Sequence, residues 1–450
     1  MANAPSLLMR SRKRGAKVAL HAPVPSRFGK QIAAGAMLLT CVGADASIAP
    51  RAVAASAQSH AFLATSGTAI RTNSGRGKKI LLRGVNLGGY LVFEPWMCPM
   101  DSSGLKDDYA ARRVLKRRFG PKIAQQLIAD YERSWIQNSD FNNISKLGLN
   151  VIRLPIWYMN LQHHDGTWRR HPFKQIDWVV RHAWAHGLYT IVDMHGVPGG
   201  QSNSDDTGRM RKHPKFFNNA ADINRTVALW RRIARHFRGN PAVAGYDLLN
   251  EPTAAPSRAA LWAVYRRLYT AVRSADPAHI IFVEGCWSGN VHGKNIGWGW
   301  NALPAPTRFH WRNVVYEMHS YNWDGNSTPA QMQNTNGQVR DFQAHKKWNV
   351  PCYIGEFNVL APAPNPEKIW AYTAKTWSAQ GMSWTMWSYK AAHGTGNDSW
   401  GLYNPRAPMP PTPNLRTDSA KVIRRDWQKW STARSFAINS MLRPALAISR

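Results

Sequence analysis

Acidic residues and cysteines are both scarce in this sequence, and each scarcity excludes a class of protein. The 450 residues include 26 Asp and Glu against 58 Lys and Arg, which gives a formal net charge of +32 at pH 7. Four cysteines in a chain of this length are too few for a scaffold held together by disulfides. A hydrophobic fraction of 44% is typical of a globular protein, so a wholly disordered chain is excluded as well.

Long apolar runs are also missing, and the most apolar stretch lies near the N-terminus. No run reaches about 18 uninterrupted apolar residues, which excludes a protein with several membrane spans. Residues 1–57 begin with basic residues, continue with a short run of apolar and small residues over 32–44, and end in alanine-rich stretches. This order predicts a secretory signal, and the alternatives are a disordered basic tail or an uncleaved anchor. We therefore expect a secreted or periplasmic protein without an integral membrane span after processing.

The remaining cysteines and the basic residues carry few functional cues. Cys98, Cys286 and Cys352 follow the predicted signal, so at least one thiol is unpaired within the chain. Basic clusters over 112–118 and 231–238 fall on predicted helix exteriors and within no recognisable nucleic-acid motif. We expect solvated helix faces and no nucleic-acid partner. The alternative is loose attraction to an acidic envelope surface or another polyanion, whose affinity would fall steeply with salt.

Eight short apolar runs recur along the chain, with helical patterns between them. Brief, continuous apolar runs indicate strands buried on both faces of a parallel sheet, and eight strand–helix units predict a closed (β/α)8 TIM barrel. We expect one catalytic domain over 58–430, followed by a tail or peripheral helix over 431–450. A doubly wound open sheet is the alternative, weakened by the lack of a glycine-rich phosphate motif after any strand. The predicted strands start near residues 80, 150, 189, 244, 280, 314, 352 and 383, and helical patterns cover 123–147, 173–184 and 259–272.

Polar and aromatic residues follow the predicted strands at their carboxyl ends, where the reactive groups of such barrels lie. Each of them alone has an ordinary structural explanation, such as a hydrogen-bonded histidine or a helix entry. Their joint occurrence favours a catalytic site. The residues are Arg153, His195, Asn250, Glu251, His319, Tyr321, Glu356 and Trp387.

Two of these residues, Glu251 and Glu356, suit the cleavage of a glycosidic bond. One carboxylic acid must protonate the leaving oxygen, while the other carboxylate attacks the anomeric carbon or activates water. A separation of about 5–5.5 Å between the carboxyl groups would indicate retention, and a wider one inversion. Arg153 and Tyr321 would keep a nucleophilic carboxylate ionised, and Asn250 could bond the sugar 2-OH.

The 21 tryptophans are consistent with sugar binding, because indole faces stack on the apolar faces of sugar rings. The alternative is that most of them fill a large core. Sixteen histidines show no metal-ligand spacing, and no Gly-x-Ser-x-Gly elbow is present, so we expect neither a metal nor another cofactor. The tryptophans at predicted strand ends or in loops are Trp96, Trp287, Trp298, Trp300, Trp323, Trp387 and Trp400.

Over about residues 60–430 the chain resembles glycoside hydrolase family 5, the cellulase-type retaining glycosidases. The motifs Asn250-Glu251-Pro252 and Gly355-Glu356-Phe357 carry the resemblance, which implies Glu251 as acid/base and Glu356 as nucleophile. The supporting residues of the family match in the same order. They are Arg153, His195, Asn250, His319, Tyr321 and Trp387.

A narrower resemblance concerns the run from Arg83 to Trp96, which is similar to the opening motif of the exo-β-1,3-glucanase branch. It implies that Glu94 binds the terminal glucose. The runs 319–323, which contains Trp323 as a further substrate-binding candidate, and 355–358 are more similar to bacterial cellulases or mannanases. The resemblance thus implies a retaining hydrolase of β-1,3- and/or β-1,4-linked glucans. Together with the predicted signal, it leads us to expect a secreted enzyme, and we expect a monomer. The alternatives are a mannanase of the same family and a catalytically silent, carbohydrate-binding or envelope-associated barrel.

Overall fold

The computed structural model describes residues 62–100, 104–285, 299–322, 327–358, 365–392 and 400–442. The predicted signal over 1–57, Cys286 and three of the candidate tryptophans, Trp287, Trp298 and Trp323, lie outside these residues. Within the described ranges, no helix combines the length and the apolar character that a membrane crossing needs.

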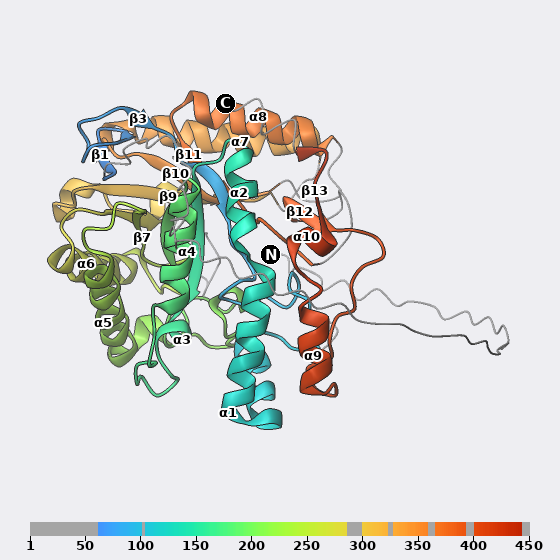
Figure 1. The fold of residues 1–450 in the computed structure, drawn as a ribbon. Helices are drawn as coiled ribbons and strands as arrows, with labels where there is room; N and C mark the ends of the chain where they lie inside the picture. Colours follow the sequence, from blue (N-terminus) through green and yellow to red (C-terminus); the bar gives the residue numbers. More distant parts are fainter. Residues whose placement is uncertain are drawn as a thin grey trace, which may run out of the picture. The chain divides into compact units, whose positions relative to one another are not determined.

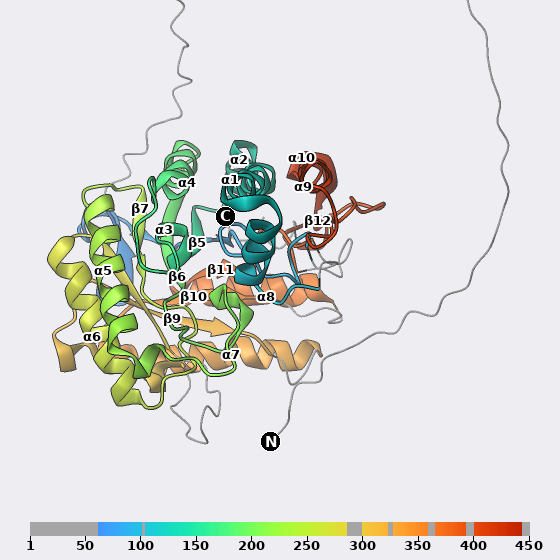
Figure 2. The same cartoon turned by 90° about the horizontal axis from the view of Figure 1, so that it is seen from below.

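Eight parallel strands close into a barrel, which confirms the predicted fold (Figures 1 and 2). The strands follow one another around the barrel in chain order, and the last one, β11, pairs with the first, β4. Side chains of β5 and β6 are buried along their whole length, as expected for strands covered on both faces. The strands are β4 (Arg83–Asn86), β5 (Val151–Trp157), β6 (Tyr189–Gly196), β7 (Val243–Asp247), β8 (Ile280–Glu284), β9 (Val314–Ser320), β10 (Cys352–Phe357) and β11 (Ser383–Met386).

The first predicted strand is wrong in one respect, because its apolar run is divided between two sheets. Lys79–Ile80 (β3) pairs with Ala69–Arg71 (β2), which pairs with Ala64–Ser66 (β1), all antiparallel. The barrel strand begins only at Arg83. Leu82, between the two strands, is fully buried in one apolar cluster with residues of both sheets. Hydrophobicity alone cannot reveal this change of partner, because the apolar residues continue from Ile80 through Leu82 to Val85 without interruption by a turn signal.

The helices surround the barrel, and their caps explain where several of them begin (Figure 2). The pattern over 123–147 belongs to two helices, because α1 begins at Asp108 and α2 at Asn138. The Asp107 side chain caps α1 by accepting from the amide of Ala110, and Gln137 and Asp140 form a capping box at α2. The helices are α1 (Asp108–Trp135), α2 (Asn138–Lys146), α3 (Tyr158–Leu161), α4 (Lys174–Ala185), α5 (Ala220–Phe237), α6 (Arg258–Ala275), α7 (Thr328–Ala344), α8 (Pro366–Ala379), α9 (Ala420–Trp427) and α10 (Thr432–Ser435).

Two further parts complete the fold. After α9 and α10, β13 (Phe436–Ile438) pairs antiparallel with β12 (Tyr403–Pro405). The segment from 431 to 442 thus contains a short helix and a strand. Short 3-10 helices occur in the connections, namely η2 (Asp205–Thr207), η3 (Phe216–Asn218), η5 (Gly299–Ala302), η6 (Pro306–Phe309) and η7 (Lys346–Trp348).

Candidate active site

A pocket of about 430 Å³ lies at the carboxyl ends of the barrel strands. Among the described residues that line it, five are carboxylic acids and none is Lys or Arg. It is therefore strongly acidic in a protein whose net charge is strongly positive. The lining residues are Glu94, Trp96, His195, Ser204, Asp205, Asp206, Glu251, His319, Tyr321, Glu356, Trp387 and Trp400.

Glu251 and Glu356 approach each other across one histidine. The Nδ1 atom of His319 lies 2.9 Å from Oε1 of Glu251 and 3.6 Å from Oε2 of Glu356. Because both distances meet at one atom, these two carboxyl oxygens are at most about 6.5 Å apart. The separation is small enough for both groups to reach one sugar unit.

Each glutamate is held by its backbone setting. Glu356 lies within β10, whereas Glu251 follows β7 in a left-handed conformation with a φ of 39°. Non-glycine residues adopt this conformation where surrounding contacts impose it, often at functional sites. Here the amide of Glu251 donates to Oε2 of Glu284 at 2.6 Å. Only glycine fits at the neighbouring position 355, because a Cβ on Gly355 would overlap the Glu317 carboxylate.

The contacts of Glu356 favour its ionised form. Nη1 of Arg153 lies 2.9 Å from Oε1, and the hydroxyl of Tyr321 donates to Oε2 at 3.0 Å. A positive charge and a hydrogen bond to the anion both stabilise a carboxylate. Glu251 differs, because burial raises the pKa of its carboxyl, and the nearby His195 and Arg153 only partly oppose this effect. The two acids are thus biased toward different protonation states.

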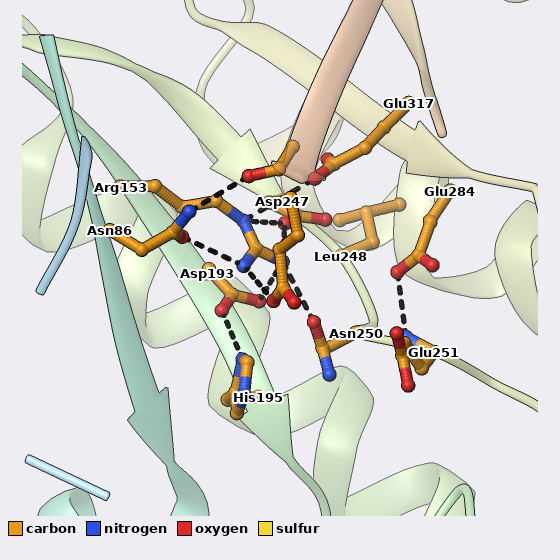
Figure 3. Close-up of polar contacts among 12 residues, drawn as sticks. Asn86, Arg153, Asp193, His195, Asp247, Leu248, Asn250, Glu251, Glu284 and Glu317 are labelled. Carbon is orange, nitrogen blue, oxygen red and sulfur yellow. Dashed lines mark hydrogen bonds and ion pairs between the residues drawn. The ribbon is translucent and has the colours of Figure 1, made fainter. Parts of the chain in front are cut away.

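Arg153 is the centre of a buried polar network that Figure 3 shows. The fully buried guanidinium lies within 3.3 Å of carboxylate oxygens from Asp193, Asp247 and Glu317, in addition to Glu356. One positive charge cannot balance four negative ones in a buried site. Burial, with Arg153 opposing it, accordingly raises the pKa of Asp193 to about 7 and that of Asp247 to about 6.

Asn250 and Glu94 extend the polar wall of the site. The side-chain oxygen of Asn250 accepts from Nη2 of Arg153 at 2.9 Å, and its amide group donates to Asp206 at 3.3 Å. Oε2 of Glu94 accepts from the Trp96 indole at 2.9 Å, whereas its buried Oε1 has no hydrogen-bond partner within the described part of the chain. Burial, together with repulsion from Asp205, raises the pKa of Glu94.

The histidines of the pocket are kept neutral. Burial lowers the pKa of both His195 and His319 to about 4. Nδ1 of His195 lies 2.6 Å from Asp193, and its ring is parallel to Trp387 at a centroid distance of 5.4 Å. At neutral pH both rings therefore offer hydrogen bonds without adding charge beside Glu251.

The structure sorts the candidate aromatic residues into two groups. Trp96, Trp387 and Trp400 line the pocket, and the rings of Trp96 and Trp400 meet edge to face at 5.4 Å. Trp300 instead is 1% exposed and packs in the core against Tyr316. Some tryptophans of this chain therefore line the pocket and others fill the core, so both alternatives that the sequence left open occur.

Several site residues are absent from the sequence-based set. Asp205 and Asp206 reach the pocket from η2, in the long connection after β6. Asp193, Asp247, Glu284 and Glu317 lie inside barrel strands and are fully buried. An acid within an otherwise apolar strand is a signal that could have found this second group. For the loop acids the signal is a resemblance, because the run from Asp206 to Arg209 is similar to the exo-β-1,3-glucanase branch.

One group of side chains could hold a metal ion. Ligand atoms of Glu251, Glu284 and His319 lie within 4.8 Å of one another. Hydrogen bonds among the same residues account for this convergence, because Glu251 contacts both of the others. The sequence-based expectation of a site without metal stays a prediction.

Comparisons with known proteins agree with this geometry. The model of the cellulase family (glycosyl hydrolase family 5) matches residues 121–393. A β-xylosidase of Phanerodontia chrysosporium is 27% identical, over 73% of this chain and 71% of the relative. A probable glucan 1,3-β-glucosidase A of Aspergillus clavatus is 29% identical over 48% of this chain, a match that spans about half (54%) of that relative.

A solved structure gives the same fold. The crystal structure of an endogalactoceramidase superposes with a TM-score of 0.58 at 18% identity, covering 86% of this chain and 84% of that one. At this identity the likeness concerns the fold alone. Barrel, pocket and family model together lead to one conclusion: the chain belongs to the cellulase family, glycosyl hydrolase family 5, and is a glycoside hydrolase.

Proposed function

We propose that this protein is a secreted hydrolase of β-1,3- and/or β-1,4-linked glucans that acts with retention of anomeric configuration. The proposal rests on the different environments of two neighbouring acids, Glu356 and Glu251. The Glu356 carboxylate pairs with the Arg153 guanidinium and accepts from the Tyr321 hydroxyl, while burial raises the pKa of Glu251. A nucleophile and a general acid with these properties are what double displacement requires.

In the first step, a carboxylate oxygen of Glu356 attacks the anomeric carbon and forms a covalent glycosyl ester. The bond to the leaving oxygen breaks, and Glu251 transfers its proton to that oxygen. In the second step, Glu251, now ionised, takes a proton from water, whose oxygen attacks the anomeric carbon and releases Glu356 as the carboxylate. The bound of about 6.5 Å on the oxygen separation is compatible with direct attack.

The remaining site residues would bind and orient the sugar. The Asn250 amide suits a hydrogen bond to the 2-OH, and the ring of Trp387 offers an apolar face to the sugar. His195 and His319 contribute neutral hydrogen-bonding groups, and Glu94 has a free carboxyl oxygen that can accept from a sugar hydroxyl. Trp323 remains a substrate-binding candidate on sequence grounds.

A hydrolysis panel tests the substrate class. The relative named as a glucan 1,3-β-glucosidase and the motif over 83–96 support β-1,3-linked glucan as the first choice. We expect release of reducing sugar from laminarin and, as the alternative linkage, from cellulose oligomers. Preferential release from mannan would make the protein a mannanase, and no release from any of them would favour a silent binding barrel.

The stereochemistry of the first product tests the mechanism. Proton NMR during early turnover should show the β-anomer before mutarotation, because two successive inversions at one carbon restore its configuration. Initial appearance of the α-anomer would contradict double displacement. The size of the first products from a long glucan, glucose or longer oligomers, distinguishes attack at chain ends from internal cleavage.

A further inference from the structure

A second hollow lies on the flank of the barrel, between α1 and α4, which run side by side (Figure 1). It measures about 1390 Å³ and shares no lining residue with the catalytic pocket. A smaller hollow of about 490 Å³ continues it around the start of α1, because both are lined by Tyr109 and Arg113. We call the two hollows together the α1–α4 groove.

Positive charge dominates the α1–α4 groove. Seven Lys and Arg against three Asp and Glu line the larger hollow, and the smaller one adds four further cations against one further acid. One of the acids counts for less than a full charge at neutral pH, because burial raises the pKa of Glu132 to about 7.

Several of these cations are available to a ligand. Lys116, Lys174 and Arg181 are exposed, and none of them forms an ion pair with any described residue. Arg169 is half-buried, its Nε donates to the carbonyl of Met159, and no carboxylate of the described chain lies within ion-pair distance. Burial lowers the pKa of this guanidinium, so a bound anion would compensate for water that Arg169 has already lost.

The floor of the groove favours a sugar polymer among polyanions. Tyr109, Met159 and Trp178 are half-buried lining residues that offer apolar and aromatic surface beside the cations, whereas Leu91, Ile128 and Ile176 are buried beneath it. The lining residues of α1 extend from Tyr109 to Arg133, on both sides of a kink at Gly120, where the backbone is not helical. Such a surface can contact the apolar faces of several sugar rings while the cations pair with their charged groups.

We propose that the α1–α4 groove binds a segment of an acidic polysaccharide whose sugars carry carboxylate groups. The ligand occupies a site separate from the catalytic pocket and is not the substrate, because the described lining of the pocket includes five acids and offers no Lys or Arg to pair with an anionic chain. Arg209, in the smaller hollow, holds its guanidinium 4.0 Å from the ring of Tyr109 and follows η2, which carries the pocket residues Asp205 and Asp206. A bound polymer therefore keeps the enzyme on an acidic matrix with the pocket close to it. This inference does not depend on the substrate of the pocket.

The test compares two triple variants that change the net charge equally. The groove variant is Lys116→Glu, Lys174→Glu and Arg181→Glu, and the control variant replaces exposed arginines of α5, Arg231→Glu, Arg235→Glu and Arg238→Glu. Binding of polygalacturonate is measured by calorimetry with the full chain at about 150 mM salt. We expect the groove variant to lose at least roughly tenfold in affinity and the control about twofold or less, since only the groove residues surround the ligand.

Other probes decide between ligands and guard against misfolding. Hydrolysis of a soluble neutral glucan should proceed at the wild-type rate in both triple variants. The single variants Lys174→Glu and Arg181→Glu should also lose affinity for polygalacturonate, each by less than the groove variant. Equal losses in the two triple variants, or no binding by the wild type, would overturn the proposal. Tighter binding of sulfated polysaccharide, double-stranded DNA or anionic lipid vesicles than of polygalacturonate would overturn the assignment to a carboxylated glycan.

Discussion

The catalytic pocket and the α1–α4 groove carry opposite charge, although both belong to one barrel domain. In the part of the chain that the structure describes, five acids and no Lys or Arg line the pocket, whereas cations prevail in the groove. The net charge of +32 describes neither region. The local charge of a surface, and not the net charge of the chain, therefore indicates which kind of ligand that surface binds. In this chain the pocket with Glu251 and Glu356 differs in charge from the chain as a whole.

The two regions also handle charge differently. In the pocket and directly beneath it, burial raises the pKa of several acids, among them Glu94, Asp206 and Asp193. The groove cations Lys116, Lys174 and Arg181 are exposed and keep their charge in water. Salt screens exposed charges much more than buried ones. The comparison therefore predicts different responses of the two regions to mutation, salt and pH.

The largest effect is expected from removing a catalytic carboxylate. Glu356→Gln and Glu251→Gln should each lower kcat by roughly three or more orders of magnitude, because the nucleophile or the general acid is lost. Turnover of β-glucan and thermal unfolding are measured together. The matched control is Glu132→Gln in the groove, which should leave kcat near that of the wild type. Near-full activity of either pocket variant would remove the proposed mechanism.

The next effect concerns stability. Arg153→Met should lower the free energy of unfolding by about 3–5 kcal/mol, because removing the cation leaves buried carboxylates without their partner. The comparison variant in the groove is Arg169→Met, which loses one hydrogen bond and should cost about 1 kcal/mol. Denaturant unfolding of both proteins measures the difference, and equal costs would contradict the view that the two arginines have different electrostatic surroundings.

Salt should affect ligand binding in the groove and in the pocket differently, without any mutation. Raising the salt concentration from about 50 to 500 mM should weaken polygalacturonate binding at least roughly tenfold, since the groove charges are exposed. The KM for a neutral glucan should change by less than about twofold, because no charged ligand enters the pocket. Parallel changes in both quantities would show that the two regions are not electrostatically independent.

The smallest expected effect is a pH dependence of groove binding. Glu132 faces Arg112, Arg133, Arg169 and Asp108, and burial raises its pKa to about 7. Its negative charge is present above this pH and is lost as the pH falls through it. Polygalacturonate should therefore bind about two- to threefold more tightly at pH 6 than at pH 8. Glu132→Gln should reduce this dependence, and an unchanged pH profile in that variant would exclude Glu132 as its cause.

Much of the fold followed from the sequence because its signals are local. Each buried strand is a short apolar run, and the carboxyl ends of parallel strands meet at one end of a barrel. For this reason the strand-end residues Arg153, His195, Glu251, His319 and Glu356 could be grouped before any coordinates were known. The structure brings all of them together around one pocket or directly beneath it.

The missed features depend on contacts between distant segments. The first barrel strand loses Lys79–Ile80 to a separate sheet, and the cause is the pairing with β2, far outside the run itself. Asp205 and Asp206 reach the pocket through the path of a long loop, which composition does not determine. The α1–α4 groove forms where two helices leave space between them, although their basic residues are visible in the sequence as ordinary helix exteriors.

The network around Arg153 has one more consequence, which concerns acidic surroundings. Asp193 and Asp247 take up protons near pH 7 and pH 6, well before an ordinary carboxylate does. As the medium acidifies, these two competitors for the guanidinium become neutral, and Arg153 attracts Glu356 with less opposition. Acidification thus shifts the balance of this network from the buried aspartates toward the Arg153–Glu356 ion pair.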